Sequence, residues 1–118
     1  MEKLKEEKMS IYKGDNTAAY GGAFITIEVS NPELVKISKI VFVVNGGIIK
    51  REWTDENYFQ VAETVLTVNF DSTETKKLSS TNVGNLITYD EFGRQATCDQ
   101  YVTFSAKQGV IGDVKCHC

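Results

Sequence analysis

Apolar and polar residues alternate along several short segments of this chain, as they do in half-buried β-strands. In residues 23–29 the odd-numbered positions are Ala, Ile, Ile and Val, whereas the even-numbered positions are Phe, Thr and Glu. In residues 65–70 the even-numbered positions are Leu, Val and Phe, and the odd-numbered positions are Val, Thr and Asn. Both segments are therefore predicted to be strands with one face in a core.

Turn-forming residues separate the predicted strands. The most apolar run, 37–44, is followed by Asn45-Gly46-Gly47, and Asn-Gly is the preferred pair for a tight hairpin turn. The sequence Asp90-Glu91-Phe92-Gly93-Arg94 predicts another turn. The strand that contains residues 65–70 is predicted to span 61–70, and further strands are predicted at 11–12, 48–53, 84–89, 96–106 and 110–111.

One short helical turn is predicted near residues 72–78. Asp71 or Ser72 is a suitable N-cap, and Glu74 or Thr75 follows at the spacing of a capping box. Elsewhere no long helical pattern is present, so the fold class is all-β with about seven or eight strands. The short spacing of the turns favours a β-sandwich over a barrel, although periodicity alone does not separate the two.

The chain divides into three parts. Residues 1–9 form a charged leader, helical or disordered, within which Met9 is a second plausible start beside Met1. Residues 10–112 form the β-sandwich domain, and residues 113–118 form a C-terminal tail.

Composition narrows the function classes. The 118 residues are 42% hydrophobic and 25% charged, which suits one globular domain. The net charge of −3 argues against general nucleic-acid binding, which needs a basic surface. No apolar run is long enough for a membrane helix, and the charged start lacks the features of a signal peptide. We therefore expect a cytoplasmic site of synthesis and no nucleic-acid or membrane partner.

Catalytic and metal-binding chemistry has little support. The single histidine, His117, makes a histidine-based triad improbable, and Cys98 has no base near it in the sequence. Cys116, His117 and Cys118 form the one candidate site for a soft metal, but a closed zinc site needs four ligands. The alternative is a terminal segment without a role. We expect no enzyme activity and no cofactor.

A polar loop flanked by aromatic residues is the candidate partner-binding site. It comprises residues 53–59, in which Trp53, Asp55, Glu56, Tyr58 and Phe59 are the predicted contact residues. Aromatic side chains are enriched at protein interfaces, although a domain of this size also needs aromatics in its core.

The order of these motifs resembles a known family. Between about Ser10 and Val110 the chain is similar to the immunoglobulin-like N-terminal domain of upper baseplate proteins in Gram-positive phages. The segments that carry the resemblance are Ile11–Asn16, Phe24–Ile27, Ile40–Val43, Phe70–Leu78 and Tyr89–Thr97.

The resemblance implies an immunoglobulin-like sandwich and a structural role in a phage or prophage particle, as a tail or baseplate component. It also implies protein partners, either other virion subunits or further copies of the chain in a homo-oligomer. The expected location is the virion, or the host cytoplasm during assembly. The alternative function is a small phage-encoded inhibitor that binds a host defence protein.

Overall fold

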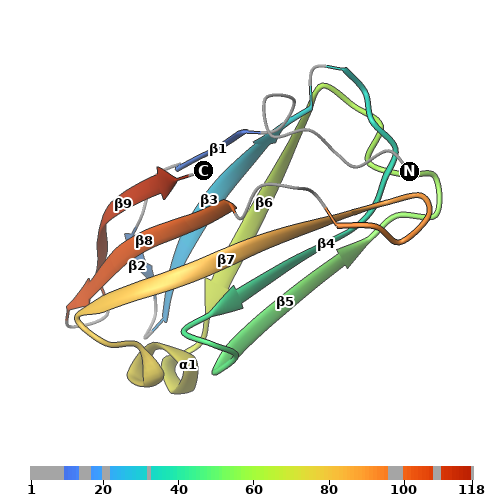
Figure 1. Cartoon of the computed structure of the whole chain (residues 1–118). Helices are drawn as coiled ribbons and strands as arrows, with labels where there is room; N and C mark the ends of the chain where they lie inside the picture. The colour runs from blue at the N-terminus through green and yellow to red at the C-terminus, as the bar shows by residue number, and fades with distance from the viewer. Residues whose placement is uncertain are drawn as a thin grey trace.

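The chain folds as two antiparallel β-sheets packed face to face (Figure 1). The computed structural model describes residues 10–13, 17–19, 22–31, 33–95, 100–107 and 110–117, which form nine strands and one short helix. The predicted all-β sandwich is thereby confirmed, with slightly more strands than the seven or eight expected.

The first sheet is built around β3 (Gly22–Ser30). One edge of β3 pairs with β6 (Glu63–Phe70) over its whole length. The other edge pairs with β1 (Ser10–Lys13) and β2 (Thr17–Ala19). In the described part of the chain β6 is therefore an edge strand.

The second sheet has the order β5-β4-β7-β8-β9. Its strands are β4 (Ile37–Val44), β5 (Ile49–Thr54), β7 (Thr81–Asp90), β8 (Gln100–Lys107) and β9 (Val110–His117). The chain crosses from the first sheet to the second between β3 and β4, returns between β5 and β6, and crosses again between β6 and β7. These crossings between two packed antiparallel sheets are typical of immunoglobulin-like folds.

The core lies between the sheets, and the alternation in the sequence predicts it well. Ile25, Ile27 and Val29 of β3 are buried, as are the even-numbered residues of β6 from Leu66 to Phe70. The odd-numbered residues of β6 are exposed. Contributions from the second sheet to the same cluster are Ile37, Ile40, Phe42, Val44, Ile49, Leu86, Val102, Phe104 and Ile111.

One close approach in this core requires a glycine. Gly84 of β7 lies beneath the ring of the fully buried Phe42, and a Cβ at position 84 would lie 2.2 Å from the ring atom Cζ. Because carbon atoms pack no closer than about 3.5 Å, no other residue fits there without moving the ring.

The turns follow the residues predicted for them. The β4–β5 hairpin has positive φ at Asn45 and Gly46, as a type I′ turn requires, and Gly47 donates its amide to Val44. At the predicted helical turn, α1 (Ser72–Lys77) begins after Asp71, which forms a capping box with Glu74. The C-cap is Leu78.

One predicted boundary is wrong. Residues 113–117, expected to be a tail, belong to β9, in which Val102 pairs with Cys116 and Tyr101 with His117. Their weak β-propensity concealed the strand, because pairing with a neighbouring strand outweighs intrinsic preference. An irregularity in register between Thr103 and Ser105 lets the pairing continue past Gly112. The predicted leader, 1–9, lies outside the described residues.

A candidate protein-binding site at the loop end

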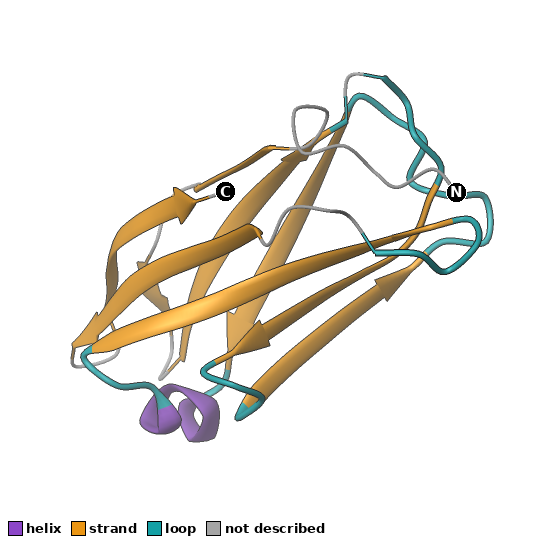
Figure 2. Cartoon of the chain, in the orientation of Figure 1, coloured by secondary structure: helices purple, strands orange, loops and turns teal. Residues whose placement is uncertain are grey.

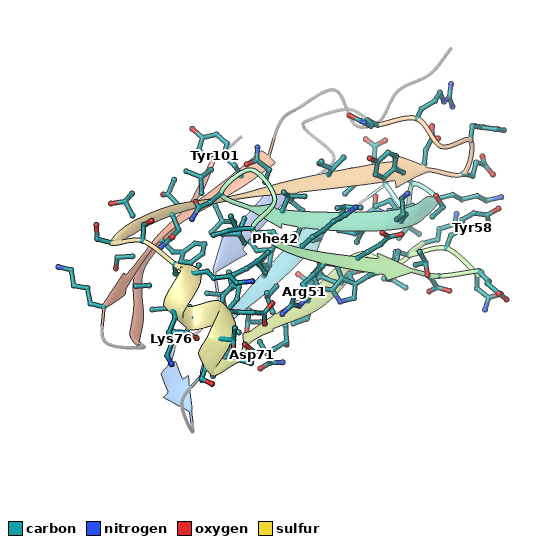
Figure 3. All side chains as sticks on the ribbon, turned by 90° about the horizontal axis from the view of Figure 1, so that it is seen from below. Phe42, Arg51, Tyr58, Asp71, Lys76 and Tyr101 are labelled. Carbon is teal, nitrogen blue, oxygen red and sulfur yellow. The ribbon has the colours of Figure 1, made fainter. Side chains whose placement is uncertain are left out.

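Three loops gather at one end of the sandwich (Figure 2). They join β3 to β4, β5 to β6 and β7 to β8, and we call their described residues (31, 33–36, 55–62 and 91–95) the loop end. The helix α1 and the β4–β5 turn lie at the other end; in Figure 3 Tyr58 and Asp71 accordingly stand far apart. In antibody variable domains, loops gathered in this way at one end of a sandwich form the binding site.

A buried asparagine joins two of these loops. Asn31 is only 1% exposed, and its Nδ2 donates to the carbonyl oxygens of Val35 (2.8 Å) and Phe59 (3.3 Å). Its Oδ1 accepts from the Val35 amide (3.1 Å), and its own amide donates to Ala62 (2.7 Å). The β3–β4 and β5–β6 loops are therefore held in a fixed relation.

Hydrogen bonds with β4 hold the β5–β6 and β7–β8 loops against the second sheet. The Phe59 amide donates to the Ile37 carbonyl (2.8 Å), which anchors the β5–β6 loop. The hydroxyl of Ser38 donates to the Asp90 carbonyl (2.7 Å), at the point where the β7–β8 loop begins. All three loops are thus attached to one rigid strand.

The β7–β8 loop is shaped by a nearly buried carboxylate. Asp90 Oδ1 accepts from the amides of Phe92 (2.9 Å) and Arg94 (2.8 Å), and Oδ2 accepts from Arg94 Nε (2.7 Å). Burial by itself raises the pKa of Asp90, but these donors outweigh it, so that the pKa lies below its usual value. The charged form of Asp90 therefore stabilises the turn.

Large apolar side chains are exposed at the loop end. Phe92, at the tip of the β7–β8 loop, is 71% exposed, and Leu34 and Val61 are also exposed. Charged groups lie beside them: Arg94 stacks on the Phe92 ring at 4.8 Å. An exposed aromatic residue beside an arginine is a combination enriched at protein interfaces.

A lysine links the loops across this surface. Lys36 lies 5.6 Å from the centre of the Tyr58 ring, and its ammonium is 3.6 Å from a carboxylate oxygen of Glu91. One side chain therefore touches all three loops, although an exposed pair of this kind contributes only about 0–1 kcal/mol to stability.

The backbone at the loop end is strained at two large residues. Leu34 has φ 55° and Tyr58 has φ 63°, in the left-handed region that bulky residues seldom occupy. Each such residue costs on the order of 1–3 kcal/mol, and strain of this kind clusters at functional sites.

The structure separates the five contact residues predicted from the sequence. Trp53 and Phe59 are partly buried and pack against the core, so their main role is structural. Asp55 turns the chain, because its Oδ1 accepts from the Asn57 amide (2.9 Å). Glu56 is exposed, and the half-buried Tyr58 contacts Lys36, so these two remain available to a partner.

Sequence reasoning missed Leu34 and Phe92, which lie in the other two loops. The sequence did indicate the exposure of Phe92, because this residue lies in the predicted turn 90–94 and outside the alternating segments whose apolar residues face a core. Nothing in the sequence alone indicates that three loops separated by many residues meet at one end.

The predicted metal site lies largely outside the described residues. The backbones of Cys116 and His117 belong to β9, but their side chains are not described, and Cys98 and Cys118 lie outside the description altogether. Among the residues that are described, no group of three or more His, Cys, Asp or Glu side chains is placed to hold a metal ion. No helix within the described ranges is long and apolar enough to cross a membrane.

Comparison with known proteins gives no match for this chain. No family model matches the chain, and neither a curated protein nor a solved structure gives a significant match.

Proposed function

We propose that this chain is a non-catalytic protein-binding module of a phage or prophage particle, and that it engages a neighbouring protein through the loop end. The observation that carries the binding role is the set of exposed apolar side chains on loops that are held rigidly from beneath. The assignment to a particle is supported by the order of sequence motifs that resembles the upper baseplate domain.

Rigidity supports a binding role for the loops. Asn31 and Ser38 fix the loops by hydrogen bonds to backbone atoms, so little conformational entropy is lost when a partner binds. A surface that is ordered before binding converts more of its contact area into affinity.

The chemistry of the surface supports a protein partner. Leu34, Tyr58, Val61 and Phe92 come from three different loops, and two of them have a charged neighbour: Lys36 lies over the Tyr58 ring and Arg94 over the Phe92 ring. Aromatic residues and arginine are enriched at protein–protein interfaces, so this composition suits a protein partner.

Purified particles from a strain that encodes this chain provide the test. We expect mass spectrometry to detect the chain in the particles, and chemical cross-linking to join Lys36 to another virion protein. Replacing Leu34 and Phe92 together by Ser should reduce the amount of chain per particle several-fold, because truncating side chains near the centre of an interface costs about 1–2 kcal/mol or more in total.

A matched variant separates binding from general surface change. Ile48→Ser removes an exposed apolar side chain at the opposite end of the sandwich, and it should leave incorporation unchanged. Absence of the chain from particles, or equal incorporation of both variants, contradicts the proposal. Absence from particles together with loop-end-dependent binding to a host protein would establish the inhibitor function instead.

A further inference from the structure

Among the described residues, no strand pairs with the edge of β6 that faces away from β3, and this edge has little protection. Edge strands present unpaired backbone groups, and natural proteins blunt them with charged residues, prolines or inward-pointing charges. We infer that β6 pairs with β6 of a second copy of this chain, and that this joins the two first sheets into one continuous sheet. The contact uses a surface separate from the loop end and does not rest on the proposed function.

The hydrogen bonds identify which residues of β6 face the open edge. Asn31 donates its amide to the Ala62 carbonyl, in the same register as the β3–β6 pairing, so even-numbered residues of this segment direct their backbone groups toward β3. Odd-numbered residues must direct theirs away. The Asn69 carbonyl confirms this alternation, because it accepts from Arg51 Nη2 of the other sheet (2.9 Å).

Within the part of the chain that the structure describes, the open part of this edge therefore consists of Glu63, Val65 and Thr67. Each of the three presents an amide and a carbonyl outward, and Arg51 covers the edge beyond them at Asn69. Val65 is 57% exposed and Thr67 is exposed. From Thr64 to Phe70 the strand carries no charge and no proline, a composition that favours strand pairing.

The neighbouring edge strand, β5, is protected by contrast. The Asp55 amide donates to the Ser38 carbonyl, in register with the β4–β5 pairing, so the even-numbered residues of β5 face its open edge. Two of these are the exposed, charged Lys50 and Glu52. An incoming strand would have to accommodate both charges, whereas the described open edge of β6 carries a single charged residue, Glu63, at its end.

Symmetry selects the occupant and the register. In an antiparallel pair centred on Val65, residue 65 lies opposite its own copy and Glu63 lies opposite Thr67 of the partner. If the pairing were shifted by two residues toward α1, Asn69 would have to pair with the second copy, but its carbonyl oxygen already accepts from Arg51. A register moved by four would place Glu63 opposite Asp71, which is a like-charge pair. The two-fold pairing centred on Val65 sets Glu63 opposite an uncharged residue and avoids both penalties, and two-fold dimers are the commonest form of assembly.

Such a dimer points its two loop ends in opposite directions, because the β6 strands run antiparallel and each begins beside the β5–β6 loop. The dimer can therefore bind two partners on opposite sides.

Charge substitution at position 65 tests the pairing directly. Opposed residues in a hydrogen-bonded antiparallel pair have Cα atoms about 5.5 Å apart. Val65→Lys and Val65→Glu each place like charges across the two-fold axis, and each alone should raise the dissociation constant of the dimer several-fold. An equimolar mixture of the two variants should recover dimer formation.

Sedimentation velocity over micromolar to millimolar concentrations measures these constants. The matched control is Val83→Lys, which adds the same charge at an exposed valine of β7, a strand paired on both sides. We expect the unmodified chain and this control to dimerise equally. A monomer at every concentration, a Val65→Lys dimer as strong as the original, or no recovery in the mixture would each overturn the inference.

Discussion

Replacing Asn31 by Ala should destabilise the fold and loosen the loop end together. The substitution removes three side-chain hydrogen bonds at a site that is 1% exposed. It also leaves the amide and carbonyl of Val35 and the carbonyl of Phe59 without these partners. Each hydrogen bond contributes about 1 kcal/mol, and unsatisfied buried groups add to this. We therefore expect a loss of about 2–4 kcal/mol in the free energy of unfolding.

Urea denaturation followed by tryptophan fluorescence measures this loss, since Trp53 packs against the core. The midpoint should fall while the slope stays constant, because the folded and unfolded states expose the same surface as before. Hydrogen exchange should also accelerate at the amide of Val35.

Two companion variants sharpen the result. Asn57→Ala alters an exposed asparagine of the same loop end and should change stability by no more than about 0.5 kcal/mol. Asn31→Asp keeps an acceptor for the Val35 amide but loses the donor to two carbonyls, so it should be at least as damaging as the alanine variant. If Asn31→Ala and Asn57→Ala were equally mild, the role given to Asn31 would be wrong.

Two further predictions concern the core and acid stability. Gly84→Ala should lower the free energy of unfolding by about 3 kcal/mol, because the added methyl group overlaps the Phe42 ring. Phe42→Leu should relieve part of that loss, so a double-mutant cycle measured by chemical denaturation should show favourable coupling between the two positions. Strictly additive effects would contradict the overlap. For Asp90, the folded pKa lies below its ordinary value of 3.8, so its charged form stabilises the fold above that pH, and this contribution is lost as the pH falls through the folded pKa. Thermal unfolding at pH values from neutral down to strongly acidic should show Asp90→Asn to be less sensitive to acid than the original chain, and an unchanged profile would refute this.

The strands and their faces were predictable because each depends on local alternation. The parity of β6 and the capping box at Asp71 need no knowledge of distant residues, and both are confirmed. The extension of β9 to His117 was not predictable, because it depends on pairing with β8 rather than on its own residues.

The candidate site was only partly predictable for the same reason. The segment 53–59 stood out by composition, but two of its three aromatics, Trp53 and Phe59, pack on the core. The exposure of Phe92 and the meeting of three loops follow from topology, which a single sequence does not encode locally. The bulky Leu34 at positive φ would have been assigned an ordinary conformation.

The loop end also has a mechanical consequence for the whole molecule. The β3–β4 loop and the β5–β6 loop are the links through which the chain passes between the two sheets at this end, whereas the β7–β8 loop stays within the second sheet. A partner that binds Leu34, Tyr58 and Phe92 together would connect all three loops, and would therefore link the two sheets at this end of the sandwich. Under the proposed function, binding there would oppose sliding of one sheet over the other, and the bound module would unfold at a higher temperature than the free one.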